Sequence, residues 1–243
     1  MQLPRTVKYF EFSCTFVVVL VLAASAPCQA SSDSATVNDW EAVARQYVLA
    51  DQKLLELEEK KLEGIPQQLD LRDDLRSSLA KVPLPTIDQL KLLLGSSNSL
   101  NRKTALVAVF FKKVTDSDII RATLNNYSKE DDFFIRFYSH QALMNLSDSQ
   151  LRTVQADITR IITTEKYETL QVTSLPTLLR LQRNVTVPIL VTYFKKGSPG
   201  LKRAAYATLR SSGRNDDLGK IKAMLKADKA TSAIEFLNDL EKS

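Results

Sequence analysis

Apolar residues recur at every third or fourth position along most of the chain, which is the period of an amphipathic α-helix. The first sustained run has apolar residues at Trp40, Val43, Tyr47, Ala50, Leu54 and Leu57. It predicts a long helix after Asn38, a favourable N-cap with Glu41 at the capping-box position. The helix is expected to continue to about Glu63, where Gly64 and Pro66 end it. The same spacing is typical of a coiled-coil seam. Fewer than three heptads are present, however, so we favour a helix packed on the rest of the chain.

Two shorter helices are predicted before residue 96. The first covers residues 67–81, and its apolar positions are Leu69, Leu71, Leu75 and Leu79. Residues 82–85 contain two prolines, which favour an extended linker because the residue before each proline is pushed out of the helical region. Thr86 and Gln89 then have the spacing of a capping box at the start of the second short helix, which contains Leu90.

From residue 97 onward the pattern repeats every 31–35 residues. Four nine-residue segments align, and they begin at Asn101, Ile135, Leu170 and Leu201. Their second position is polar, and its residues are Arg102, Arg136, Gln171 and Lys202. Their fifth position is small, and its residues are Ala105, Ser139, Ser174 and Ala205. Their ninth position is aliphatic, and its residues are Val109, Leu143, Leu178 and Leu209. A small residue one turn before an aliphatic one lets two helices approach closely.

A second helix is expected after each of these segments. Its predicted N-caps in the four copies are Ser117, Ser149, Thr186 and Asp216. A last helix, about residues 230–241, closes the series. Helix pairs at this period predict an all-α chain built as an α-solenoid of about four helix pairs, preceded by one long amphipathic helix and shorter helices.

The repeated segments carry a family resemblance. Leu201–Leu209 (LKRAAYATL) resembles the first helix of HEAT-like repeats of the phycobilisome-lyase type, and Ile135–Leu143 is similar to the same helix in a second copy. Pro176 falls inside a predicted helix, and HEAT helices are often kinked by proline. The resemblance covers residues 97–243 and implies a HEAT-like fold. It implies no lyase activity, since most proteins with such repeats have none.

The first 30 residues have the order of a secretory signal peptide. Arg5 and Lys8 precede an apolar run over residues 16–24, and small residues lead to Ala30. The apolar run is shorter than the roughly 20 residues that a membrane-spanning helix needs. We therefore expect cleavage after Ala30 and export to the periplasm or the medium, with no transmembrane span left after cleavage.

Two other interpretations of this segment stay open. The segment is either retained as an uncleaved anchor or, less favourably, linked to lipid at Cys28. Pro27 stands where lipoprotein signals usually have a small residue. Both cysteines of the chain, Cys14 and Cys28, lie in residues 1–30. The mature chain would hold no cysteine, hence no disulfide, thiolate nucleophile or cysteine metal site.

The balance of acidic and basic residues divides residues 31–243 into two regions. Residues 31–96 contain 8 basic and 12 acidic residues, whereas residues 97–243 contain 23 and 15. The change coincides with the turn signal at residues 95–99. The predicted domains are thus a signal peptide (1–30), an acidic N-terminal helical region (31–96) and a basic HEAT-like repeat domain (97–243).

No catalytic centre is apparent in the sequence. The single histidine, His140, occupies an outward position of its helix in the repeat alignment, so we expect it at the surface or its boundary. Gly-x-Ser-x-Gly, a phosphate loop and a dinucleotide fingerprint are absent. The adjacent carboxylate pairs, such as Asp131-Asp132, suit helix N-termini, because neighbouring helical positions do not face each other. We predict no catalytic residue, no cofactor and no metal.

The basic C-terminal third is the one feature of the sequence that suggests a function. Residues 180–229 hold 12 basic residues against 3 acidic ones. The candidate binding surface consists of Lys195, Lys196, Lys202, Arg203, Arg210, Arg214, Lys220 and Lys222. Equivalent positions of successive solenoid repeats line one surface, which would attract an acidic protein or another polyanion.

These features favour an exported, non-enzymatic scaffold for protein–protein interaction. The alternative is binding of a polyanion or an anionic membrane surface through the basic repeats, and an ordinary solvated face also accounts for the charges. Export argues against nucleic acid as the ligand. Steep loss of binding with salt distinguishes the alternative from the scaffold.

Overall fold

The computed structural model describes residues 40–242, and the regular secondary structure in that range is α-helical throughout. The predicted all-α class is therefore confirmed. The predicted signal peptide (1–30) and the predicted cap Asn38 lie outside the described residues. The chain divides between Ser147 and Asp148 into two compact units. We name their described parts the N unit (40–147) and the C unit (148–242).

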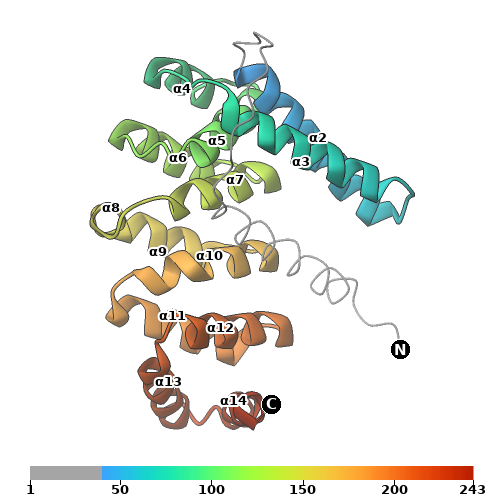
Figure 1. The fold of residues 1–243 in the computed structure, drawn as a ribbon. Helices are drawn as coiled ribbons and strands as arrows, with labels where there is room; N and C mark the ends of the chain where they lie inside the picture. Colours follow the sequence, from blue (N-terminus) through green and yellow to red (C-terminus); the bar gives the residue numbers. More distant parts are fainter. Residues whose placement is uncertain (1–39, 243) are drawn as a thin grey trace. The chain divides into compact units, whose positions relative to one another are not determined.

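The helices follow one another through short connections (Figure 1). The N unit contains α2 (Trp40–Lys60), α3 (Ile65–Lys81), α4 (Ile87–Leu94), α5 (Ser99–Phe111), α6 (Ser117–Lys129) and α7 (Phe133–Met144). The C unit contains α8 (Asp148–Thr153), α9 (Gln155–Thr164), α10 (Glu168–Arg180), α11 (Arg183–Lys196), α12 (Pro199–Ser211), α13 (Asn215–Ala227) and α14 (Thr231–Lys242). The change of net charge near residue 96, where a domain boundary was predicted, falls inside the N unit. There α2 and α4, which precede residue 96, pack on α5, which follows it.

The long first helix packs on its own chain. Trp40, Tyr47 and Leu54 are buried, and α2 contacts both α3 and α5. The apolar seam is therefore used inside the N unit, in agreement with the favoured interpretation of the sequence.

The turn after this helix differs from the prediction. α2 ends at Lys60, and the left-handed residue that follows it is Lys61, with φ 51°. The amide of Leu62 donates to the carbonyl of Leu57 at 2.9 Å, which closes the helix end. Gly64, with φ 96°, is the N-cap of α3. Gly64 thus begins the second helix instead of ending the first.

The repeated sequence positions have matching structural roles. The four small residues at the fifth position and the four aliphatic residues at the ninth are all buried, on α5, α7, α10 and α12. The polar second position makes the same contact in three copies, with the carbonyl six residues earlier. Arg102 donates to Ser96 at 2.6 Å, Arg136 to Glu130 at 3.4 Å and Gln171 to Glu165 at 2.7 Å. These bonds satisfy carbonyls just before each helix.

Equivalent helices of successive pairs pack on one another within each unit. In the N unit, α5 contacts α7, and in the C unit, α10 contacts α12 while α11 contacts α13. Side chains of one pair also bond carbonyls at a helix end of the pair before it. The amide of Asn145 donates to Phe110 at 2.8 Å, and Arg214 donates to Leu179. Such bonds satisfy carbonyls that a helix end leaves without an intrahelical donor.

The predicted caps of the second helices are wrong in detail. The cap of α6 is Asp116, whose carboxylate accepts from the amide of Asp118 at 2.9 Å, and Ser117 is the first helical residue. Ser149 lies inside α8, and that second helix is divided into α8 and α9 at Val154. Thr186 lies inside α11 and donates to the carbonyl of Leu178 at 2.9 Å.

The remaining cap prediction, Asp216, is also wrong, because Arg214 is the N-cap of α13.

The error at Thr186 has a physical reason. A buried threonine hydroxyl can donate to carbonyls within a helix, so its preference for caps does not fix a helix start. Sequence alone does not show which of these two roles a given threonine has.

The close approach at the small positions gives a stability prediction. Ala205 is buried on α12, which packs against α10, whereas Ala207 on the same helix is exposed. We expect Ala205→Leu to lower the free energy of unfolding by about 1–3 kcal/mol, because extra methylenes overfill a packed interface. Denaturant titration measures the loss. Ala207→Leu is the control, and equal effects of the two substitutions would contradict the assigned register.

Candidate binding surface of the C unit

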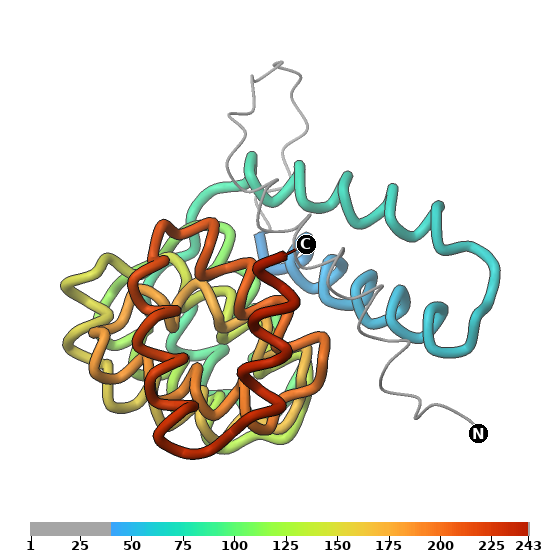
Figure 2. The backbone as a smooth tube through the Cα atoms, turned by 90° about the horizontal axis from the view of Figure 1, so that it is seen from below, coloured from blue at the N-terminus to red at the C-terminus, as the bar shows by residue number. Residues whose placement is uncertain are grey.

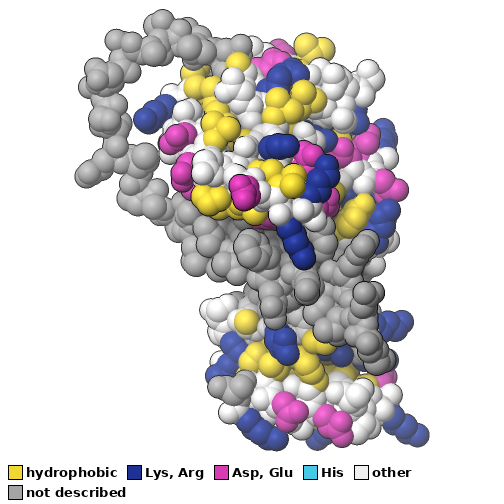
Figure 3. Space-filling view, turned by 90° about the vertical axis from the view of Figure 1, so that its right-hand side faces the viewer, with side chains coloured by type: hydrophobic (Ala, Val, Ile, Leu, Met, Phe, Trp, Pro, Cys, Tyr) yellow, Lys and Arg dark blue, Asp and Glu magenta, His cyan; other side chains and the backbone are white. Residues whose placement is uncertain are grey.

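The structure places all eight predicted binding residues in the C unit. Lys195 and Lys196 are on α11, while Lys202, Arg203 and Arg210 are on α12. The remaining three are Arg214, the N-cap of α13, and Lys220 and Lys222 within α13. Figure 3 shows Lys and Arg side chains along the edges of this unit. Nothing in the fold shows that they bind a ligand, so the binding surface stays a prediction.

Three of the eight make contacts with a neighbouring helix or connection. Lys195 pairs with Asp228 at 3.0 Å. Lys222 pairs with Glu241 of α14 at 2.6 Å. The ammonium of Lys202 lies 5.4 Å from the centroid of the Phe236 ring, as in a cation–π contact. These side chains link neighbouring elements of the C unit, so a partner would have to compete with an internal contact.

Arg214 belongs to the interior. Its Nε donates to the carboxylate of Asp217 at 2.6 Å, and its Nη1 donates to the carbonyl of Leu179. Asp217 is 0% exposed, and Arg183 approaches its second oxygen at 3.5 Å. A charge held in this way fastens α13 to the end of α10, which is a structural role.

The other four basic side chains carry charge that no acidic residue of the described part of the chain neutralises. Lys196, Arg203 and Lys220 are exposed and have no ion pair or hydrogen bond within residues 40–242. Arg210 is exposed and donates to the neutral amide of Asn215 at 3.3 Å. We call Lys196, Arg203, Arg210 and Lys220 the basic surface. Of the predicted residues, these four have charges available to a partner.

His140 was predicted at the surface or its boundary, and that prediction is wrong. It is 3% exposed, and its ring meets the ring of Tyr127 edge to face at 4.9 Å. The guanidinium of Arg136 lies over the Tyr127 ring, 4.6 Å from its centroid. α7 is packed by both α5 and α6, so little of its circumference is left to solvent.

The N unit contains a buried carboxyl that sequence reasoning missed. Asp51 on α2 is 5% exposed, and the hydroxyl of Tyr138 on α7 donates to its Oδ2 at 2.7 Å. Burial raises the pKa of Asp51 to about 6, although the Tyr138 hydrogen bond and the charge of Arg72 oppose that shift. The signal in the sequence is the spacing, since Asp51 lies on the same helical face as Tyr47 and Leu54.

Over residues 40–242, no three His, Cys, Asp or Glu side chains gather as metal ligands would. In that same range, none of the helices has the length and apolar character needed to cross a membrane. Comparisons of the chain with protein-family models, with curated proteins and with solved structures found no match. The resemblance to HEAT-like repeats therefore rests on the sequence segments alone.

Proposed function

We propose that the protein is an exported, non-enzymatic scaffold that binds a partner protein through HEAT-like helix pairs. The observation that carries the proposal is the basic surface, and above all Lys196, Arg203 and Lys220. These cations are exposed and have no acidic partner among the described residues, whereas neighbouring ones such as Lys195 are paired. Unneutralised charge on one unit steers an acidic partner and favours its binding.

The solenoid part of the proposal is supported by the repeated contacts. Equivalent helices of successive pairs pack on each other, and the second, fifth and ninth positions have recurring roles. Stacked pairs of this kind expose long surfaces suited to binding extended partners. The export part rests on the residue pattern of positions 1–30.

Binding of a polyanion or an anionic membrane surface is the second candidate. The distribution of the basic surface over α11, α12 and α13 favours it, because a dispersed set of cations suits a ligand with many negative charges. It differs from the first candidate in salt dependence. Binding that rests on many exposed ion pairs is screened at high ionic strength.

A crosslinked capture from the exported fraction tests the proposal. The bait is wild-type protein beside the variant Arg203→Glu/Lys220→Glu, at low and high salt. The control is Arg121→Glu/Lys129→Glu, which reverses two exposed charges of α6 in the N unit. We expect wild type and control to recover the same acidic protein, and the variant to lose it.

Two results would contradict the scaffold. Recovery of lipid or anionic polymer alone, abolished by salt, would replace it with the second candidate. Equal recovery by the Arg203/Lys220 variant would exclude the basic surface as the contact.

A further inference from the structure

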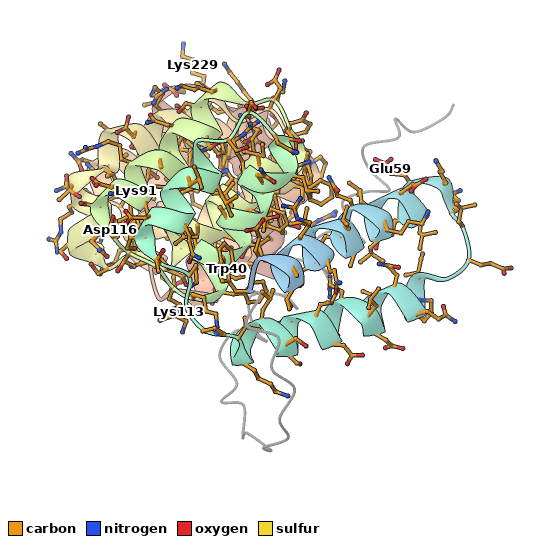
Figure 4. The ribbon with its side chains drawn as sticks, turned by 90° about the horizontal axis from the view of Figure 1, so that it is seen from above. Trp40, Glu59, Lys91, Lys113, Asp116 and Lys229 are labelled. Atoms are coloured by element: carbon orange, nitrogen blue, oxygen red, sulfur yellow. The ribbon has the colours of Figure 1, made fainter. Side chains whose placement is uncertain are left out.

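The α2–α3 hairpin exposes apolar side chains that the N unit does not cover. Figures 2 and 4 show the two helices side by side, extending away from α4–α7. Leu62 in the connection and Leu71 on α3 are 46% and 48% exposed. Asp74 lies one turn after Leu71 and shares its helical face, and Asp70 lies one turn before Asp74. The exposed side of α3 thus places a leucine beside Asp74, with a second carboxylate one turn before Asp74.

Some exposed carboxylates of this hairpin are paired within the described part of the chain and others are not. Glu56 is paired with Lys53 at 3.1 Å and with Lys60 at 2.7 Å, and Asp73 with Arg72 at 3.4 Å. Four others are exposed and have no ion pair or hydrogen bond in the described part of the chain, and they are Glu59, Glu63, Asp70 and Asp74. Figure 4 labels Glu59 near the closed end of the hairpin. We call these four residues with Leu62 and Leu71 the hairpin surface.

The C unit also has an exposed apolar side chain beside an exposed charged one, and there the charge is positive. Met224 of α13 is 39% exposed, and Lys220 precedes it by one turn on the same helical face. Arg203 contributes a further unpaired cation from α12, a helix in contact with α13. Met224 beside Lys220 on one unit is therefore complementary to Leu71 beside Asp74 on the other.

We infer that the partner of the basic surface is the hairpin surface of a second copy of this chain. The inference rests on the proposed function, since it names the partner of the same surface. Each copy carries both halves of the contact, so two copies associate head to tail. Such a contact closes into a reciprocal dimer or continues along a row of copies. Opposite charges set the orientation, while contact between Leu71 and Met224 removes apolar area from water.

Sedimentation equilibrium of the purified protein tests the inference. At low salt we expect a mass of at least two chains, and in about 1 M salt, where the Debye length is about 3 Å, the mass of one chain. Asp70→Lys/Asp74→Lys and Arg203→Glu/Lys220→Glu should each give the mass of one chain at low salt. The protein with all four substitutions should regain the larger mass, because the charges are again opposite.

The control Arg121→Glu/Lys129→Glu should keep the wild-type mass. Circular dichroism checks that each variant is folded, and recovery of association in the fourfold variant also excludes a folding defect. A single-chain mass for the wild type at low salt would overturn the inference. If such a monomer still captured a different, acidic protein through Arg203 and Lys220, the proposed function would stand without the inference. Persistent association in both charge-reversal variants would likewise overturn the inference.

Discussion

Replacing Asp51 by Asn is expected to stabilise the protein at pH 8 by about 2–3 kcal/mol and to change little at pH 4 or below. Burial raises the pKa of Asp51 from its ordinary 3.8 to about 6 in the folded state, and one pKa unit corresponds to about 1.4 kcal/mol. The folded protein holds this proton where the unfolded chain has released it. Stability is therefore lost as the pH rises from about 4 to 6, and the loss persists above 6.

Asparagine avoids this loss because it carries no charge, and its carbonyl oxygen still accepts from Tyr138. Denaturant unfolding at pH 4, 6 and 8 measures the difference. Asp74→Asn, at an exposed position of α3, is the control and should leave stability unchanged within about 0.5 kcal/mol. A wild type at least as stable as Asp51→Asn at pH 8 would contradict this account. It would mean that buried Arg72 holds the carboxylate as a favourable ion pair.

Replacing Arg214 by Ala is expected to cost about 3–5 kcal/mol, the usual result of removing one partner of a buried ion pair. Asp217 is 0% exposed and would keep Arg183, at 3.5 Å, as its remaining cation. The carbonyl of Leu179 would also lose the donor that joins α10 to α13. Denaturant unfolding at neutral pH measures the loss.

A double variant separates the cost of leaving the Asp217 carboxylate without Arg214 from the cost of shortening the Arg214 side chain. Arg214→Ala/Asp217→Ala also removes the buried carboxylate that has lost its closer cation, so it should recover part of the stability lost in Arg214→Ala. Arg210→Ala is the matched control, since Arg210 is exposed and bonded to a neutral amide. A loss from Arg214→Ala no larger than that of the control would show that the buried pair does not hold α13 in place.

Local chemistry made much of the helical structure predictable. The period of apolar residues indicated the helices, and the aligned small and aliphatic positions are all buried. The predicted capping box of Thr86 and Gln89 is present, with bonds of 3.2 and 2.8 Å. The burial of Asp51 and His140 was missed because it depends on helices distant in the sequence. α2 packs on α5, and α7 is enclosed by α5 and α6.

The candidate surface was predicted only as a set of residue types. Sequence showed an excess of basic residues, but not which of them meet an acid. Lys195 pairs with a residue 33 positions away and Lys222 with one 19 positions away, so folding decides their roles. Folding equally leaves Lys196, Arg203 and Lys220 without partners among residues 40–242. The distinction between structural and available cations required the structure.

Site-specific photocrosslinking in the producing cells tests the central claim most directly. A photoreactive residue replaces Arg203 of the basic surface in one strain and exposed Thr163 of α9 in another. The account predicts a discrete adduct at position 203, either with an acidic protein or with the acidic hairpin of a second copy of this chain, and no such adduct at position 163. No protein adduct at position 203, or the same adducts at both positions, would contradict it.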